Sequence, residues 1–277
     1  MTGFENIVIG KSSVPSLIIT VMIMIVIPVV FFVCWHRRHK NQINIRWFIA
    51  GALGFIVSAR VLELLVHYFC IIADNPVSRF INGNTAAYVL YGITMAGVFE
   101  EGGRYVILKY ILKQNRTREN AVLYGIGHGG IEILAVLLPT MVLYLVVAIL
   151  FSTGDTEKAL KILNITEETA AAALPSVQAA AAFDYSMMAL NVIERLMAMS
   201  MHISLTVIVY YGVVNSKKIW LPMAIVLHML ADTFPALYQR SVLPLWVVEV
   251  WGTFWSVVIL LVAVKLYRRM TSNEESV

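Results

Sequence analysis

The sequence predicts an all-α, polytopic membrane protein with about seven transmembrane helices around a polar chamber inside the bilayer. Of its 277 residues, 59% are hydrophobic and only 14% are charged, whereas soluble domains are about 45–50% apolar and about 25% charged. The mean hydropathy is +0.77. Apolar stretches of roughly 20 residues, the length that crosses the hydrocarbon core of a bilayer, recur along the chain. The protein is therefore expected in a cell membrane as a multi-pass chain.

Seven apolar segments account for the predicted spans. They are 14–34, 47–72, 86–111, 120–151, 183–213, 219–238 and 244–266. The first is longer than the apolar core of a signal peptide, which has about 7–15 residues, and its basic cluster follows it instead of preceding it. It is therefore predicted to be a retained helix. The fourth and fifth segments are longer than the bilayer is thick, which requires a tilt, a kink or a protrusion.

The distribution of basic residues predicts an N-terminus outside and a C-terminus inside. Thirteen Lys and Arg fall in the segments that this orientation places in the cytoplasm, and five fall in the external segments, in keeping with the positive-inside rule. Residues 1–13 then form a short external N-terminus, 14–266 a single transmembrane domain and 267–277 a cytoplasmic tail. The stretch 152–182 is an extracytoplasmic loop, in which Thr166 and the helix formers after it predict a short amphipathic helix. The basic loops explain the net charge of +4, and no nucleic-acid partner is expected.

Ionisable residues are numerous inside the predicted spans. Each costs about 2.5–3.5 kcal/mol at the centre of a membrane helix, so partners within the protein must offset this penalty. At a rise of about 1.5 Å per residue from the cytoplasmic end of each span, six of them fall in a slab less than about 10 Å thick. These six are Glu100, His128, Glu132, His202, His228 and Asp232. Because they come from four spans, their shared depth predicts that the side chains meet.

The spacing within each span shows which of these residues share a helix face. His128 and Glu132 are four residues apart and lie on one face, as do His228 and Asp232. Glycines surround His128 in the stretch GIGHGGIE. Small residues of this kind let helices approach closely, and here they are expected to make room beside the histidine.

Two adjacent carboxylates, Glu100 and Glu101, and the guanidinium of Arg104 interrupt an apolar helix in the stretch AGVFEEGGRYVILKY. Glu101 points about 100° away from Glu100 around the helix, so the two side chains cannot face the same spot. One carboxylate is expected to be reactive and the other structural, and Arg104 is expected to pair with one of them. Glu63 and Glu194 lie at another depth and are expected to form structural ion pairs with neighbouring arginines.

Such a cluster suits hydrolysis inside the membrane. A buried glutamate can act as a general base on water, and nearby histidines can orient that water, bind a metal or stabilise an oxyanion. His128, His202 and His228 with a carboxylate could bind Zn²⁺, although the sequence lacks the His-Glu-x-x-His motif of zincins. A proton-coupled transporter is the first alternative, because intramembrane carboxylates and histidines also form proton relays. A catalytically silent membrane scaffold is the second.

Three motifs follow one another in the chain: EEGGR at 100–104, YGIGH at 124–128 and HMLAD at 228–232. A Glu-Glu pair before a basic residue, an aromatic residue four positions before a histidine, and His-x-x-x-Asn/Asp resemble, in this order, the CPBP superfamily of CAAX proteases and bacteriocin-processing enzymes, with its PrsW-like relatives. The chain is similar above all to the YhfC family of membrane peptidases, over about residues 45–265. The resemblance implies an intramembrane endopeptidase of the bacterial cytoplasmic membrane, with a membrane-embedded or lipidated peptide or protein as substrate.

The resemblance also implies a role for each motif residue. Glu100 would activate water with the help of His128, and His228 would polarise the scissile carbonyl or stabilise the oxyanion, oriented by Asp232. The supporting residues would be Glu101, Arg104, Glu132 and His202. The superfamily is described both as metal-dependent and as glutamate-based, so a Zn²⁺ cofactor is left open. The sequence does not indicate the oligomeric state. Asp232 stands where Asn is more usual, and it suits the orientation of His228 better than the binding of an oxyanion.

Overall fold

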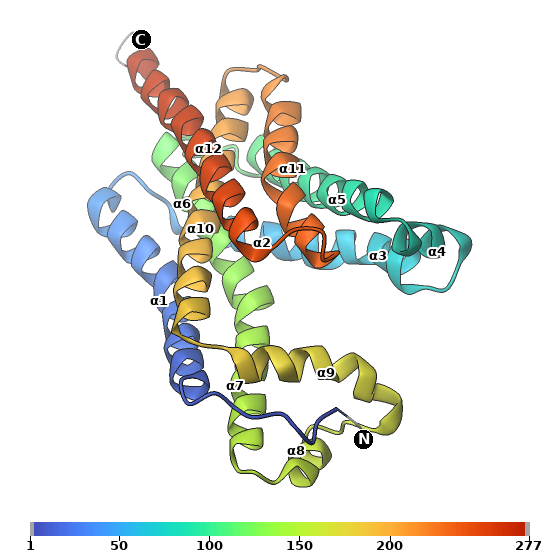
Figure 1. The fold of residues 1–277 in the computed structure, drawn as a ribbon. Helices are drawn as coiled ribbons and strands as arrows, with labels where there is room; N and C mark the ends of the chain where they lie inside the picture. The colour runs from blue at the N-terminus through green and yellow to red at the C-terminus, as the bar shows by residue number, and fades with distance from the viewer. Residues whose placement is uncertain (1–2, 275–277) are drawn as a thin grey trace. The chain divides into compact units, whose positions relative to one another are not determined.

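The computed structural model describes residues 3–274, and all the regular structure in that range is helical (Figure 1). The α-helices, in chain order, are α1 (Ser13–His39), α2 (Ile45–Phe55), α3 (Leu64–His67), α4 (Pro76–Gly83), α5 (Thr85–Val106), α6 (Arg118–Glu132), α7 (Leu138–Ser152), α8 (Thr156–Ile162), α9 (Glu167–Ala182), α10 (Tyr185–Val214), α11 (Trp220–Gln239) and α12 (Leu245–Glu274). The same range contains the π-helical segments η1 (Ile56–Glu63), η2 (Tyr68–Ile72), η3 (Ile107–Ile111) and η4 (Ile133–Leu137).

The helices confirm an all-α, multi-pass membrane protein. Six helical stretches within the described range are long and apolar enough to cross a membrane: Ser13–His39, Ile45–Ile72, Arg118–Ser152, Tyr185–Val214, Trp220–Gln239 and Leu245–Met270. The remaining predicted span, 86–111, folds as α5 and η3 but is not among these six, and it carries three buried charged side chains. The predicted tail 267–277 continues α12 as far as Glu274, and its last three residues lie outside the described part of the chain. The orientation and the domain limits stay predictions.

A π-helical segment interrupts the long fourth span, for which a tilt, a kink or a protrusion was expected. Helix α6 ends at Glu132, η4 follows directly, and α7 has Pro139 in its first turn. Turns of this kind are rare and frequently adjoin functional sites. Here the π-helical segment follows directly after Glu132, one of the predicted site residues.

The described residues divide into two compact units, of which the first comprises Met1–Ile27 and Ile133–Arg195. Its core contains Phe4, whose ring stacks on that of Phe151 with the ring centroids 6.3 Å apart. Buried side chains from α7, α8 and α9 complete this core. The segment before α1 thus packs on the same apolar cluster as the helices between α6 and α10.

The predicted loop at 152–182 folds as the two helices α8 and α9 rather than as one. Helix α9 begins directly after Thr166, as predicted, with Thr166 and Thr169 forming a reciprocal capping box. Its other end is fastened to the start of α1, where Ser13 Oγ donates a hydrogen bond of 2.5 Å to the carbonyl oxygen of Ala180. Helix α9 therefore contributes to the core of the first unit.

The second unit comprises Pro28–Glu132 and Leu196–Val277. Within it, α6 packs along α2, and α11 packs along both α5 and α12 (Figure 1). Trp47 of α2 is fully buried and meets the ring of Tyr210 of α10 edge to face, with the centroids 5.9 Å apart. These helices bring the predicted site residues of four spans into one unit.

Two glycines let the backbones of α2 and α6 touch. A Cβ atom added to Gly127 would lie 2.1 Å from the carbonyl oxygen of Phe48, and one added to Gly51 would lie 2.1 Å from that of Tyr124. No side chain fits at either position without separating the helices. This close approach confirms the packing role predicted for the glycines around His128, and it sets the position of that histidine.

We expect Gly127→Ala to destabilise the protein and displace His128, because the added methyl group meets backbone rather than a flexible side chain. Overpacking of a close-packed interior costs about 1–3 kcal/mol. The midpoint of thermal unfolding of purified protein, measured in detergent, checks this prediction. Gly102→Ala is the matched control, because a Cβ atom there has no neighbour within 4 Å. Equal stability of the two variants would contradict the backbone contact.

Candidate functional site

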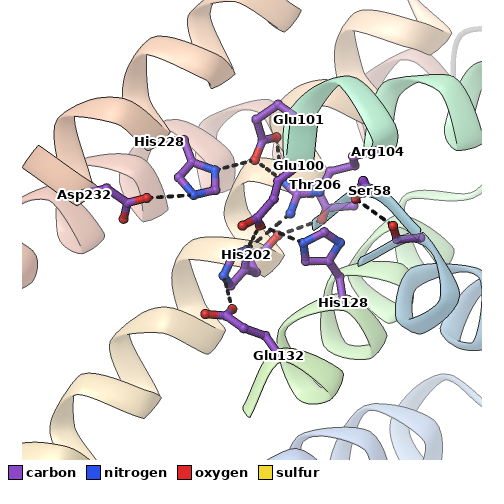
Figure 2. A network of polar contacts seen from close by, with 11 residues as sticks. Ser58, Glu100, Glu101, Arg104, His128, Glu132, His202, Thr206, His228 and Asp232 are labelled. Atoms are coloured by element: carbon purple, nitrogen blue, oxygen red, sulfur yellow. Dashed lines mark hydrogen bonds and ion pairs between the residues drawn. The ribbon is translucent and has the colours of Figure 1, made fainter. Parts of the chain in front are cut away.

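Eight polar side chains meet in the second unit (Figure 2). They are Glu100, Glu101 and Arg104 of α5, His128 and Glu132 of α6, His202 of α10, and His228 and Asp232 of α11. Six of them are almost fully buried, whereas the side chains of Glu132 and Asp232 keep 22% and 32% of their exposure. Hydrogen bonds and ion pairs link all eight into one network, which confirms the expectation that the six residues at a shared depth meet.

Glu100 lies between two histidines. Its Oε2 atom is 3.1 Å from Nε2 of His128 and 3.7 Å from Nδ1 of His202, and the two imidazole centroids are 5.0 Å apart. One donor atom from each of the three residues falls within 4.8 Å of the other two, and all three side chains are buried. Two imidazoles and a carboxylate converge here on one point.

The contacts of His202 determine which of its nitrogens carries a lone pair. The guanidinium of Arg104 can only donate to Nδ1, so in the neutral ring the proton is on Nε2, which lies against the Glu132 carboxylate. Nδ1 therefore carries the lone pair, which faces Glu100 and receives a 3.3 Å hydrogen bond from Nη2 of Arg104. Arg104 thereby sets the tautomer of this ring, and the contacts with Arg104 and Glu132 together set its orientation.

Packing holds the ring of His128. The edge of the Phe55 ring meets it with the centroids 5.2 Å apart, and Tyr124 stacks on it at 6.2 Å. Its Nδ1 atom is buried and has no hydrogen-bond partner among the described residues. His128 is therefore positioned by aromatic neighbours and by the glycine contact of its helix, with Nε2 facing Glu100.

Glu101 belongs to a second part of the network. Arg104 contacts both of its carboxylate oxygens, and Nδ1 of His228 is 2.9 Å from its Oε1 atom. Nε2 of His228 is 3.2 Å from Oδ2 of Asp232. The two adjacent glutamates thus face different partners, as their angular separation predicts, and Arg104 neutralises Glu101 rather than Glu100.

His228 does not belong to the group that could hold a metal. Carboxylate oxygens lie against both of its ring nitrogens, an arrangement that a doubly protonated imidazolium satisfies. The ligand set suggested at first was His128, His202 and His228. In the structure the third donor that joins the first two is the Glu100 carboxylate.

The donor set at Glu100 fits Zn²⁺. Two histidines and one glutamate are a ligand set found in zinc hydrolases, in which the fourth position is left to water or substrate. Metal-binding histidines usually donate their other N–H group to a carboxylate or a carbonyl oxygen. In His202, the Glu132 carboxylate lies against Nε2, and Nδ1 is the nitrogen nearer Glu100. The observation that supports a metal here is the convergence of one carboxylate and two buried imidazoles, whose donor atoms lie within 4.8 Å of one another.

Sequence reasoning missed the structural residues around this network. Ser58 donates a 2.7 Å hydrogen bond to the carbonyl oxygen of Gly54, and its Cβ would lie 2.6 Å from a Cβ atom at Gly103, so it lets η1 and α5 approach (Figure 2). Thr206 donates to the carbonyl oxygen of His202 at 2.7 Å. The glycines of EEGGR indicate a close helix contact, and a search for small residues in the neighbouring spans could have identified Ser58 as a partner of Gly103.

The two glutamates outside the slab, Glu63 and Glu194, form different contacts. Glu194 contacts Arg195, as expected, in the first unit. Among the described residues, Glu63 pairs not with Arg60, its expected partner, but with His67, whose Nε2 atom is 3.2 Å from its carboxylate. Nδ1 of His67 is in turn 2.7 Å from the hydroxyl of Tyr91. The spacing of four residues between Glu63 and His67 was the signal for this pair.

Comparison with known proteins matches most of the chain. A model of the family described as YhfC intramembrane metalloprotease matches residues 23–251, a range that contains all eight residues of the network. The "Uncharacterized membrane protein YhfC" of Bacillus subtilis (strain 168) is 29% identical to this chain over 236 residues, which are 85% of this chain and 88% of that protein. No solved structure matches the chain significantly.

Proposed function

Because the chain belongs to the YhfC intramembrane metalloprotease family, we propose that it hydrolyses a peptide bond of a membrane-embedded or lipidated protein. The observation that carries this proposal is the buried group of Glu100, His128 and His202, whose donor atoms lie within 4.8 Å of one another. Buried ionisable groups inside a membrane protein are costly and usually functional. A purely structural role would need only one hydrogen bond between two of these side chains, and not three donor atoms that converge on one point.

Glu100, His128 and His202 are the residues that would hold the metal, and Zn²⁺ is the ion that suits two imidazoles and a carboxylate. When bound, such an ion supplies Lewis acidity, which activates water and polarises a carbonyl group. The protein supplies the fixed positions of the donors. The Glu132 carboxylate lies against Nε2 of His202 and so helps to keep Nδ1 on the side of Glu100.

Proton transfer would depend on the carboxylates of the network. In the alternative without a metal, where Glu100 is not a ligand, a water beside Glu100 and His128 would have this carboxylate within reach as a proton acceptor. Because Arg104 is engaged with Glu101, it does not hold the Glu100 carboxylate in a direct ion pair. Glu100 is thus the carboxylate of the motif pair that faces His128 and His202, whereas Glu101 faces His228.

His228 would stabilise the oxyanion. Its Nδ1 side faces the completely buried Glu101, while its Nε2 side faces Asp232, whose side chain is 32% exposed. A substrate carbonyl can therefore reach Nε2 by displacing Asp232, whereas Glu101 stays in place. A cationic donor already held in position stabilises the negative charge that develops on the carbonyl oxygen.

The test of the metal assignment is the zinc content of purified protein together with cleavage of a quenched-fluorescent transmembrane peptide in proteoliposomes. We expect about one Zn²⁺ per chain, loss of cleavage after chelation and recovery after Zn²⁺ is returned. His128→Ala and His202→Ala should each lower the zinc content, because each removes one of three donors. His36→Ala is the control, because His36 is exposed and lies outside the network.

Other outcomes would point to other functions. Undiminished cleavage by metal-free protein would assign the reaction to Glu100 as a general base without a metal. A proton or solute flux that needs Glu100, without cleavage of any peptide, would favour a transporter. Binding of a partner membrane protein by the variants, with neither activity in the wild type, would favour a scaffold.

A further inference from the structure

A cavity of about 460 Å³ adjoins the network within the second unit. Residues of α3, η2, α5 and α11 line it. Asp232 belongs both to its lining and to the network, because its Oδ2 atom is 3.2 Å from Nε2 of His228. We call it the Tyr91 cavity, after a residue in its wall. Only the side chain of Asp232 separates it from His228, the proposed oxyanion donor. Its volume is within the range of ligand pockets, about 300–1,000 Å³.

The walls of the Tyr91 cavity are mostly apolar, and its polar lining residues, His67, Tyr88, Tyr91, Asp232 and Gln239, supply both hydrogen-bond donors and acceptors. Aliphatic side chains such as those of Leu64 and Ile93 form most of the lining, and no Lys or Arg is among the described residues that line it. The Asp232 carboxylate can only accept hydrogen bonds. The cavity thus suits an apolar ligand with hydrogen-bonding groups, whose N–H donors can meet acceptors such as Asp232.

Tyr91 is one of these acceptors because of the residues behind it. Nε2 of His67 is 3.2 Å from the Glu63 carboxylate and so carries the proton. Nδ1 of His67 then carries a lone pair and accepts the hydroxyl hydrogen of Tyr91 at 2.7 Å. With its hydrogen directed to His67, the Tyr91 oxygen offers lone pairs to the cavity that it lines.

A protease cleaves its substrate in an extended form. Inside a membrane, the backbone groups of that extended segment then need hydrogen-bond partners from the protein. A transmembrane helix satisfies its own backbone groups, and unwinding leaves N–H and C=O groups that each cost several kcal/mol in hydrocarbon. An irregular backbone is tolerated at membrane depth where protein groups satisfy it. The Tyr91 cavity offers acceptors in an apolar wall, next to the network.

We propose that the Tyr91 cavity binds the unwound, apolar segment of the substrate beside the scissile bond, with Tyr91 and Asp232 accepting its backbone N–H groups. This rests on the proposed peptidase function and adds the substrate class. Gly92, Ala96 and Ala236 line the cavity with little side-chain bulk, and a Cβ atom at Gly92 would have no neighbour within 4 Å. The cavity therefore favours aliphatic side chains, for which these small residues leave room.

The test measures binding and cleavage separately. The probe is an alanine- and leucine-rich transmembrane peptide with a central dansyl group, and binding is followed in proteoliposomes by energy transfer from the protein's tryptophans. Binding is measured in a Glu100→Gln background, which prevents cleavage. Gly92→Phe should weaken binding about tenfold or more, because the ring occupies the space that the segment needs. Tyr91→Phe should weaken it about 3- to 10-fold, the effect of one hydrogen bond.

Leu90→Phe is the matched control, since Leu90 lies two residues before Gly92 on α5, is 61% exposed and does not line the cavity. Its binding should equal that of the parent. Unchanged binding by both Gly92→Phe and Tyr91→Phe would overturn the proposal, even if Glu100→Gln abolishes cleavage. Absence of cleavage by the wild type, with binding still sensitive to both cavity variants, would instead overturn the peptidase function and leave the peptide site in place.

Discussion

Glu100→Gln is expected to abolish cleavage of a transmembrane peptide while the protein still inserts and folds. The Glu100 carboxylate contacts both His128 and His202. The amide keeps the shape of the side chain but can neither accept a proton from water nor supply an anionic ligand. General acid–base catalysis contributes about 10²–10⁴-fold, so kcat/KM should fall by at least that factor. Cleavage of a quenched-fluorescent peptide in proteoliposomes measures it, with circular dichroism as the check on folding.

The matched control for this substitution is Glu194→Gln. Glu194 is also an intramembrane glutamate, but it contacts Arg195, its side chain is 46% exposed and it belongs to the first unit. Its replacement should leave kcat/KM within a small factor of the wild type, since it contacts none of the network residues. Equal loss in both variants would show a general effect of removing charge. Full activity of Glu100→Gln would remove this residue from the reaction.

Hydropathy predicts the helices well because the bilayer restricts which structures can cross it. A span must satisfy its backbone internally and be apolar over about 20 residues, and both properties are local in the sequence. The stretch 47–72 and the helical run Ile45–Ile72 accordingly agree closely. Charged residues weaken this signal in the predicted span 86–111, which folds as a helix but carries part of the site. The charged residues that lower the hydropathy of this span, Glu100, Glu101 and Arg104, are the ones that it contributes to the network.

The shared depth of the site residues was predictable, but the choice of partners was not. Depth follows from counting residues along a helix, so the meeting of Glu100 with His128 and His202 could be expected. The contact between His228 and Glu101 joins residues 127 positions apart and depends on how α11 rotates against α5. No local pattern encodes that rotation, and for this reason His228 could be mistaken for a metal ligand.

Departures from α-helical geometry also limited the prediction. Glu63 was expected to pair with Arg60, three residues away, as α-helical spacing allows. Residues Ile56–Glu63 are π-helical, which changes the angles between side chains, and Glu63 contacts His67 instead. A propensity or hydropathy profile carries no signal for this segment. The Tyr91 cavity was also beyond sequence reasoning, because its walls come from α3, η2, α5 and α11 and depend on how these elements pack.

The buried ion pair between Glu101 and Arg104 leads to the second large expected effect. Both side chains have no exposed area. Removing one partner of a buried pair typically costs about 3–5 kcal/mol, because the other charge is left uncompensated. Arg104→Met should therefore lower the free energy of unfolding by about this amount, measured by denaturation in detergent. Asp74→Asn, which breaks the exposed pair with Arg79, is the control and should leave the stability unchanged within error.

A double variant separates the structural from the catalytic contribution of this pair. Glu101→Gln combined with Arg104→Met removes both charges, and replacing both members of a buried pair is often close to neutral. We expect it to recover most of the stability that Arg104→Met loses. Cleavage should stay low, because His228 no longer has the carboxylate that holds its Nδ1 side and keeps the ring charged. Recovery of both stability and cleavage would show that the pair only stabilises the fold, and that the charge of His228 does not depend on Glu101.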